Sequence, residues 1–497
     1  MLKEIHEQPR VVRDTLVGRM TPAGELDIDE LGLSLEELND IDRVYVIACG
    51  TSYHAGLIAK NLIEGWARIP TEVEAASEFR YRNPIITPTT LVVAVSQSGE
   101  TADTLAAIRD ARIKGAKVFG ITNVVGSPVA RESDGVIYTK ANKEIAVAST
   151  KSFIGQVVSL TLLALLLAQV KYRLTTKQAR MLFRELSDTA EQIQWILDTQ
   201  TEAVHEAALL CKDAQSALFV GRGMGAAISY EGALKLKEVS YLHAEAYAAG
   251  EMKHGPIALI DPGFPVIAVA TKSATYDKTV SNLMECKARG AKVIVVATEG
   301  DEEINKIADC IIRVPAVRDV FSPITASVPL QLLAREVAIL RGCDVDQPVT
   351  WQRVSQSSSW FRRYNDQGPA PRHQTEPGLY VRRNHHKGAC PLCGGFGRLA
   401  ELAGLEVLGI LVQDLGLVAE HHMQVLADQK ARLDGVATGD SAADFLVLVN
   451  NLLNVEPLRG GAQPAEALQV GIGRLEPRPH GAAARDVKDH AVHEVVA

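Results

Sequence analysis

The chain has 497 residues, a net charge of −8 and only 5% aromatic residues. This length is enough for about three domains, and the mild negative charge argues against a general nucleic-acid-binding protein, which carries a basic face. No apolar signal-peptide core follows the N-terminus, and the seven scattered cysteines fit reduced thiols. We therefore expect a cytoplasmic protein with no membrane association.

Residues 1–43 predict a helical lead-in, and the first domain is expected over 44–172. Its first segment, Val44–Gly56, predicts an apolar strand, a glycine-containing turn and small residues that open a helix. Residues Cys49–Ser52 therefore stand at the carboxyl end of a buried strand, where parallel sheets bind ligands.

The most informative motif is Ser96-Gln97-Ser98-Gly99-Glu100-Thr101, directly after the apolar run Leu91–Val95. We interpret it as a hydroxyl-rich turn between a buried strand and a helix that opens near Thr101. Backbone N–H groups, the helix dipole and three hydroxyls suit a phosphate without a lysine or arginine. The pattern of a nucleotide P-loop is absent, so the motif indicates a small phosphorylated metabolite. An ordinary polar strand-to-helix loop is the alternative.

The two halves of the chain repeat one pattern. Val44–Gly56 matches Ala217–Ser229, and Leu91–Val95 matches Pro265–Val269. Each half then runs through a helix into Gly-Ala-Lys-Val and a further strand. Alternating strands and helices with β-branched strands predict an α/β fold with two parallel sheets flanked by helices. The second half lacks the serine-rich turn, so we place the phosphate site in the first.

Two helical segments are predicted, one at the end of the first domain and one between the halves. The apolar run Val157–Val170 is too short for a bilayer span and predicts a buried helix. Residues Arg173–Cys211 have helical spacing of leucine and isoleucine, and we expect a helical connector over 173–213 before the second domain at 214–348.

An acid–base cluster is predicted between Tyr230 and Pro256. Lys235 and Glu238 share one face of the helix predicted over Glu231–Leu242. A Lys-x-x-Glu pair is common on solvated surfaces. Here it is followed by His243, His254, further acidic residues and a run of small residues, which we interpret as close packing against a ligand or a partner.

Taken together, six strings of the chain resemble the glucosamine-6-phosphate synthase family (glutamine–fructose-6-phosphate aminotransferases). The resemblance covers the isomerase half, which is built from two tandem sugar-isomerase (SIS) domains, from Met1 to about Pro348. The strings, in order, are Met1–Ile5, Cys49–Tyr53, Ser96–Thr101, Val147–Lys151, Glu231–Gly255 and Asp344–Pro348.

The resemblance implies that fructose 6-phosphate is converted into glucosamine 6-phosphate. By it, Glu238 moves a proton between C1 and C2, Lys235 positions or protonates the intermediate, and His254 assists ring opening from a neighbouring subunit. A shared site implies at least a homodimer. No cofactor and no metal are expected. The residues that would hold the sugar phosphate are Thr51, Ser52, Ser96, Gln97, Ser98, Thr101, Val147 and Ser149.

Two features depart from this family. The chain starts where the family's second half begins and carries no N-terminal cysteine, so glutamine hydrolysis is not expected of it. Ammonia would have to come from solution or from a separate glutaminase. The family's C-terminal lysine, which can form a Schiff base with the open-chain sugar, is also missing. Arg353 stands near its place, and arginine forms no Schiff base at ordinary pH.

The remaining segment, 349–497, changes in composition and predicts a largely disordered tail. We expect it to be a fused or out-of-frame translation rather than an evolved domain. Cys390 and Cys393, with His385 and His386 upstream, fit half of a zinc site, but no second pair completes it. Two free thiols are the simpler interpretation.

Three alternatives to the aminating reaction stay open. The chain is a plain sugar-phosphate isomerase or an amino-sugar-phosphate deaminase, it is a sensor that binds the sugar without turnover, or it is an inactive gene product. Retention of Lys235, Glu238 and His254 argues against the sensor, because binding alone needs no proton shuttle.

Overall fold

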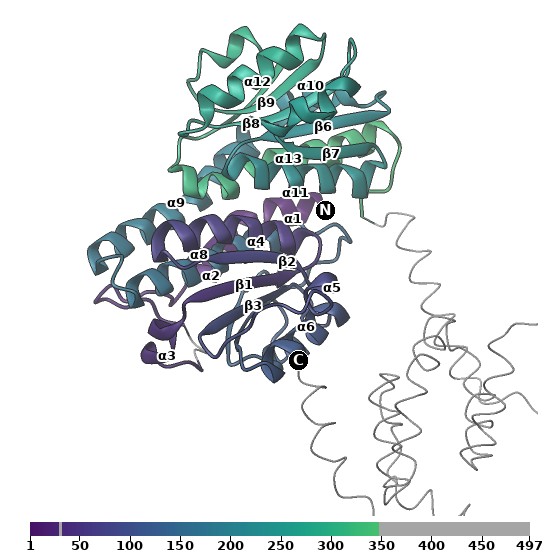
Figure 1. Ribbon diagram of the computed structural model, residues 1–497. Helices are drawn as coiled ribbons and strands as arrows, with labels where there is room; N and C mark the ends of the chain where they lie inside the picture. The colour runs from purple at the N-terminus through teal and green to yellow at the C-terminus, as the bar shows by residue number, and fades with distance from the viewer. Residues whose placement is uncertain (29–31, 347–497) are drawn as a thin grey trace, which may run out of the picture. The chain divides into compact units, whose positions relative to one another are not determined.

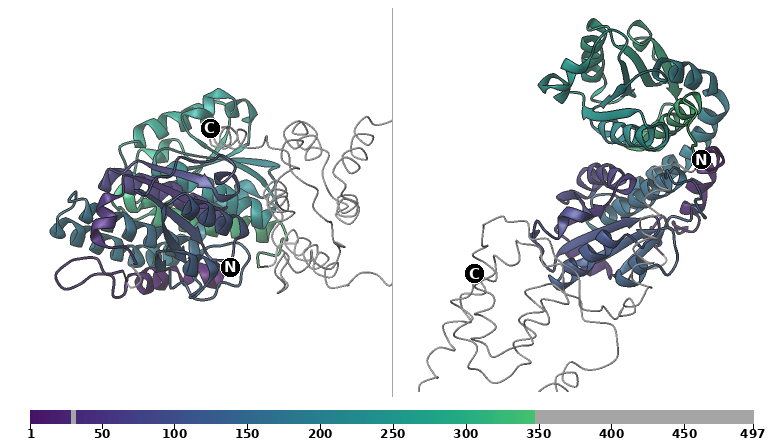
Figure 2. Two further views of the ribbon diagram at one scale, coloured as in Figure 1. Left: turned by 60° about the horizontal axis from the view of Figure 1, so that its bottom comes forward. Right: turned by 90° about the vertical axis from the view of Figure 1, so that its right-hand side faces the viewer.

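The computed structural model describes residues 1–28 and 32–346, which form two parallel five-stranded sheets with helices on both faces (Figures 1 and 2). The α/β fold class with two tandem domains is therefore confirmed for this part of the chain. The expectations for Arg353, for the cysteine pair at 390 and 393 and for the tail at 349–497 lie outside the described residues.

The first sheet has the strand order β2-β1-β3-β4-β5, and all pairs are parallel. Successive residues of β1 point to opposite faces. Val44 and Val46 join the apolar cluster formed with α4 and α8, whereas Tyr45 and Ile47 join the cluster on the side of α6. Both faces are covered, so the central strands β1 and β3 are apolar and buried along almost their whole length, whereas the edge strand β2 carries two glutamates. The strands are β1 (Arg43–Ala48), β2 (Thr71–Ala75), β3 (Thr90–Ser96), β4 (Lys117–Thr122) and β5 (Gly135–Tyr138).

The helices of this domain alternate with its strands. In Figure 1, α4 and α8 lie along one side of the sheet, and α5 and α6 lie on the other. A π-helical turn, Ile63–Ala67, extends α4. The helices are α4 (Thr51–Leu62), α5 (Ala76–Phe79), α6 (Ala102–Ile113), α7 (Pro128–Glu132) and α8 (Lys151–Val170).

The second sheet repeats the arrangement in the order β10-β9-β8-β6-β7. Its strands are β6 (Ser216–Gly221), β7 (His243–Ala248), β8 (Pro265–Ala270), β9 (Lys292–Thr298) and β10 (Cys310–Val314). Its α-helices are α11 (Met224–Ser240), α12 (Tyr276–Ala288) and α13 (Ser322–Leu340), and its short 3₁₀ helices are η2 (Glu251–His254), η3 (Pro256–Leu259), η4 (Ile304–Lys306) and η5 (Asp319–Phe321).

The repeat extends to the backbone conformation of the turns. Gly50 and Gly223 precede α4 and α11 with nearly identical angles, φ 54 and ψ −129 in the first and φ 56 and ψ −124 in the second. This left-handed conformation is open to glycine at low cost. The glycine-containing turn that was predicted in both halves is therefore the same turn.

A helical connector links the two domains. It contains two helices, α9 (Thr176–Thr199) and α10 (Thr201–Cys211), because Gln200 between them has the non-helical angles φ −103 and ψ 8. A capping box of Thr175 and Gln178 starts α9. The lead-in holds α1 (Leu2–His6), α2 (Gln8–Leu16) and α3 (Leu35–Asp40).

Two helices in the described part of the chain, Lys151–Val170 and Asp319–Leu340, are long and apolar enough to cross a membrane by composition alone. In each, most of the apolar stretch is buried inside the fold, 89% in the first and 72% in the second. Both therefore act as core helices here, as predicted for Val157–Val170.

The small residues that follow α11 lie in a strand. Ala244, Ala246 and Ala248 belong to β7, which pairs with β6 at the edge of the sheet. This pairing fixes their backbone, and the close packing of their small side chains against a ligand or a partner stays a prediction.

Candidate active site

The candidate site begins where β1 and β3 end. These strands are parallel neighbours, with Ile47 paired to Ala94, so their carboxyl ends meet at one edge of the first sheet. Cys49–Ser52 and Ser96–Thr101 therefore lie side by side, as their positions after two buried strands predict.

The loop Ser96–Thr101 is held by its own hydroxyl groups. Ser96 Oγ accepts the N–H of Gly99 at 3.0 Å and lies 3.0 Å from Thr101 Oγ1. Ser98 Oγ accepts the N–H of Glu100 at 3.2 Å. Thr101 gives α6 no side-chain cap, so the helix starts with N–H groups available to an acceptor. These features suit an anion.

Gly99 is required by the tight packing of this loop. Its φ is +66°, and a Cβ at this position would lie 2.1 Å from Ser127 Oγ. A side chain would displace the loop, so the backbone of this motif depends on glycine.

Ser52 stands at the first turn of α4 and is 9% exposed. The buried amide of Gln156, on α8, donates from Nε2 to Ser52 Oγ at 2.9 Å. Because this bond occupies a lone pair of the oxygen, the hydroxyl hydrogen of Ser52 is free to point elsewhere.

The segment with Val147 and Ser149 is held by Glu144. The carboxylate accepts the hydroxyl of Ser149 at 3.2 Å and the backbone N–H of Thr150 at 2.9 Å, just before α8 starts. A carboxylate at a helix N-terminus is favourable. Val147 is 41% exposed.

A cavity of about 660 Å³ connects the loop with this segment. Gln97 lines it from the loop, and Glu144 lines it from the segment before α8. Lys140 and Lys143 also line it, so cations stand close to the hydroxyl-rich loop.

The acid–base cluster is centred on Lys235, whose side chain is 1% exposed. Its Nζ lies 2.5 Å from Glu238 Oε2 and 3.5 Å from Glu231 Oε1. It also donates to Thr51 Oγ1 at 2.9 Å. The cluster therefore joins α11 of the second domain to the start of α4 in the first.

The direction of the Thr51 hydroxyl follows from these contacts. A lysine ammonium only donates, so Thr51 Oγ1 accepts from Lys235 and sends its own hydrogen to Glu231 Oε1, 3.1 Å away. Thr51 keeps a lone pair and can accept a hydroxyl from a bound sugar.

Lys235 stays charged although it is buried. Burial, the largest influence, lowers its pKa, but the charges of Glu231 and Glu238, the hydrogen bond to Glu238 and the charge of Glu144 raise the pKa above its ordinary value. Glu238 is 23% exposed in its side chain. The carboxylate is thus the accessible member of a pair whose ammonium is shut away from water.

Glu231 and His54 complete the cluster, and neither is among the site residues predicted from the sequence. Glu231 is 1% exposed, and its Oε2 lies 2.7 Å from His54 Nδ1. Helical spacing was the available signal, since Glu231 precedes Lys235 by four positions and His54 follows Thr51 by three.

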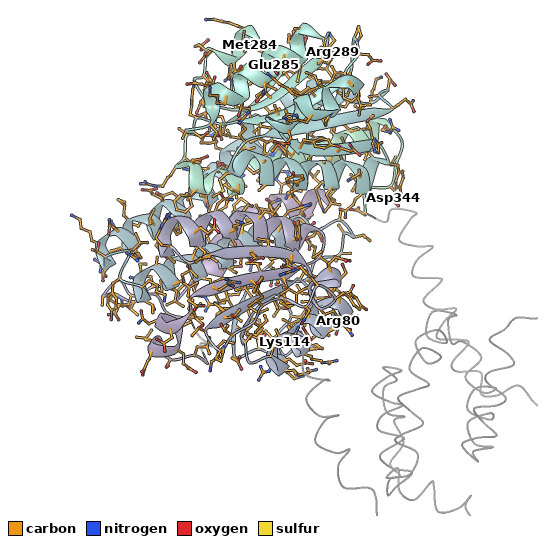
Figure 3. The ribbon with its side chains drawn as sticks, viewed as in Figure 1. Arg80, Lys114, Met284, Glu285, Arg289 and Asp344 are labelled. Atoms are coloured by element: carbon orange, nitrogen blue, oxygen red, sulfur yellow. The ribbon has the colours of Figure 1, made fainter. Side chains whose placement is uncertain are left out.

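His254 lies apart from the cluster within the described chain. It sits on η2, which is anchored by the buried Met252 and by an ion pair between Lys253 and Glu285, 2.7 Å apart. Figure 3 labels Glu285 on α12. The His254 side chain is exposed, and within residues 1–28 and 32–346 no hydrogen bond or ion pair joins it to Lys235 or Glu238.

No metal centre emerges from the described ranges, in which no group of three or more His, Cys, Asp or Glu residues is placed to hold an ion.

Comparisons with known proteins agree with this geometry. The SIS domain model matches residues 37–166 and 210–341. The glutamine–fructose-6-phosphate aminotransferase (isomerizing) of Streptomyces coelicolor is 50% identical over 352 residues, which are 70% of this chain and 57% of that protein. The chain thus spans little more than half the length of such relatives.

The match covers almost the whole length of two solved structures. The C-terminal domain of the glucosamine-fructose-6-phosphate aminotransferase from Francisella tularensis is 41% identical, with a TM-score of 0.66, over 70% of this chain and 97% of that one. Glucosamine-6-phosphate deaminase from Thermotoga maritima is 25% identical, with a TM-score of 0.54, over 70% of this chain and 97% of that one.

Proposed function

Since the chain belongs to the SIS-domain proteins and, among them, to the isomerase domains of the glutamine–fructose-6-phosphate aminotransferases, we propose that it converts fructose 6-phosphate into glucosamine 6-phosphate with ammonia from outside the chain. The observation that carries the proposal is the buried Lys235 held against the accessible carboxylate of Glu238.

In this reaction the sugar phosphate binds along the carboxyl edge of the first sheet. The loop Ser96–Thr101 supplies hydroxyls and helix N–H groups to the phosphate, and Ser52 adds a hydroxyl whose hydrogen Gln156 leaves free. Val147 and Ser149 line the sugar beside the cavity that Gln97 and Glu144 share.

Glu238 is the base that moves the proton between C2 and C1 of the open-chain sugar. A ketose-to-aldose shift needs one carboxylate to take the proton from C1 or C2 and return it at the other carbon. Lys235 holds this carboxylate in place at 2.5 Å and stabilises negative charge that develops on the sugar oxygens. Thr51 accepts a hydrogen bond from Lys235 and donates its own hydrogen to Glu231. Its second lone pair accepts the hydrogen of a sugar hydroxyl.

Ring opening is assigned to His254 of a second copy of the chain. Its exposure on a well-anchored turn supports this role, because a histidine that serves its own cluster would be expected beside it. A homodimer, with each copy completing the site of the other, follows from this assignment.

Incubation of the purified chain with fructose 6-phosphate in deuterated water, with and without ammonium, tests the proposal. The products are followed by NMR, and we expect glucosamine 6-phosphate only when ammonium is present. Glucose 6-phosphate alone would indicate an isomerase. The absence of any product, with the sugar bound, would refute catalysis and favour a sensor.

The match to the deaminase from Thermotoga maritima supports a second candidate, the reverse use of the same site on glucosamine 6-phosphate. The two directions are compared at equal substrate concentrations. The deaminase would be favoured if the chain released ammonia from glucosamine 6-phosphate faster than it formed glucosamine 6-phosphate from fructose 6-phosphate and ammonium.

A further inference from the structure

The buried cluster contains one contact that the proposed reaction does not use. His54 Nδ1 lies 2.7 Å from Glu231 Oε2, and this carboxylate is 1% exposed while the histidine is 15% exposed. The imidazole also stacks on Tyr230, with ring centroids 6.1 Å apart and planes at 24°, and meets Tyr53 edge-on at 6.0 Å. The ring is held from several sides, so its contact with Glu231 has a fixed direction.

The contact decides how the cluster shares its hydrogen bonds. Glu231 Oε1 takes the hydroxyl of Thr51 and faces Lys235 at 3.5 Å, and Oε2 takes His54. Without the histidine, Oε2 would be a buried acceptor with no donor, which costs free energy. The ammonium of Lys235 is the nearest donor that could turn toward Glu231, and it would do so at the expense of Glu238.

The charges of the cluster favour the same conclusion. Glu231 and Glu238 carry two negative charges against the single positive charge of Lys235. His54 adds a donor at the buried carboxylate. Among the residues that the structure describes, Lys237 and Cys49 line the cavity of about 260 Å³ that His54 and the two tyrosines also line, and the charge of Glu74 acts on Tyr53 beside the ring.

We propose that His54 is a positioning residue for the reaction: it binds Glu231 through Nδ1–H and thereby leaves Lys235 to Glu238 and Thr51. This inference rests on the proposed function, since it assumes that Glu238 moves the proton. His54 acts through Glu231 and is not assigned a contact with the sugar.

Three variants test this role by the rate at which fructose 6-phosphate and ammonium form glucosamine 6-phosphate, with kcat and the KM for the sugar measured separately. H54L removes the donor, and we expect kcat to fall roughly 10- to 100-fold, because a displaced base loses its alignment with the substrate. KM should change little. H54N places an amide N–H near the position of Nδ1, and it should restore most of kcat.

His205 is the matched control. It forms a histidine–glutamate contact of similar length, 2.8 Å from Nδ1 to Glu336 Oε1, but its side chain is 50% exposed. H205L should leave kcat unchanged. Equal losses in H54L and H205L, a rise in KM alone, or an H54N variant no better than H54L would overturn the proposal. Thermal melting of each variant identifies a loss that comes from unfolding.

A second readout is independent of turnover. In ¹⁵N NMR of the full chain, the His54 ring should carry a proton on Nδ1, and E231Q should shift that resonance. If Nδ1 carries no proton and its resonance does not shift in E231Q, the positioning role is overturned even in an active enzyme. A wild-type chain without turnover, but with the expected His54 resonance, would instead refute the proposed function and leave the contact established.

Discussion

Replacing Lys235 with methionine removes the ammonium between two carboxylates while keeping a side chain of similar volume. Glu231 is 1% exposed, so it would lose its charge partner without gaining water. Removing one partner of a buried ion pair costs about 3–5 kcal/mol. We therefore expect K235M to lower the free energy of unfolding by about that amount and to abolish turnover.

A surface pair of similar length is the control. Lys287 Nζ lies 2.6 Å from Asp309 Oδ2, with side chains 41% and 20% exposed. Exposed pairs contribute about 0.2–1 kcal/mol, and Asp309 keeps the N–H of Val293 as a donor. K287M should therefore lower the free energy of unfolding much less than K235M does. The Lys287–Asp309 contact is nearly as short as the contact of 2.5 Å between Lys235 and Glu238.

The assay is urea unfolding of the wild type, K235M, E231Q and the double variant. In the double variant the buried carboxylate is neutral, so the loss should be smaller than the sum of the single losses, by about 0.5–3 kcal/mol. Additive losses, or equal costs for K235M and K287M, would refute the claim that burial of Glu231 makes Lys235 indispensable.

Two further predictions concern the first domain. G99A should weaken fructose 6-phosphate binding and lower stability more than G126A does, as measured by calorimetry. Both glycines have a positive φ (66° and 68°), but only at Gly99 would a Cβ press against Ser127. Equal effects of the two substitutions would contradict this. The pKa of Glu37 is lowered from 4.5 to about 2, chiefly by its hydrogen bond with Lys117. A lowered carboxylate pKa stabilises the fold above the ordinary pKa, so the Tm advantage of the wild type over E37Q should be full at pH 7 and vanish as the pH falls from 4.5 to about 2; a constant difference would count against the ion pair.

The sheet architecture was predictable because the strands are buried on both faces. Continuous apolar runs such as Leu91–Val95, each followed by a turn and a helix, leave a parallel sheet as the simplest arrangement, and the repeat showed that there are two. The proximity of Cys49–Ser52 to Ser96–Thr101 followed from the same rule about carboxyl ends.

The contacts of the cluster were only partly predictable. Helical spacing placed Lys235 and Glu238 on one face, and it also places Glu231 there. Nothing local in the sequence brings His54, from α4 of the first domain, to a helix of the second. Such a contact depends on how distant elements pack, and the pairing appears only in three dimensions.

The break in the connector at Gln200 could not be predicted, because periodic leucines continue through it and the break depends on the backbone angles of a single residue. The strand β7 was not predicted either, because alanine and glutamate, which make up most of His243–Ala248, are depleted in strands.

The proton transfer assigned to Glu238 is the central claim, and deuterium incorporation into the sugar tests it most directly. Fructose 6-phosphate and ammonium are incubated in deuterated water with the wild type, with E238Q and with E202Q, which changes an exposed glutamate on α10. We expect deuterium at C1 or C2 of the sugar with the wild type and E202Q and none with E238Q. Undiminished incorporation by E238Q would contradict it.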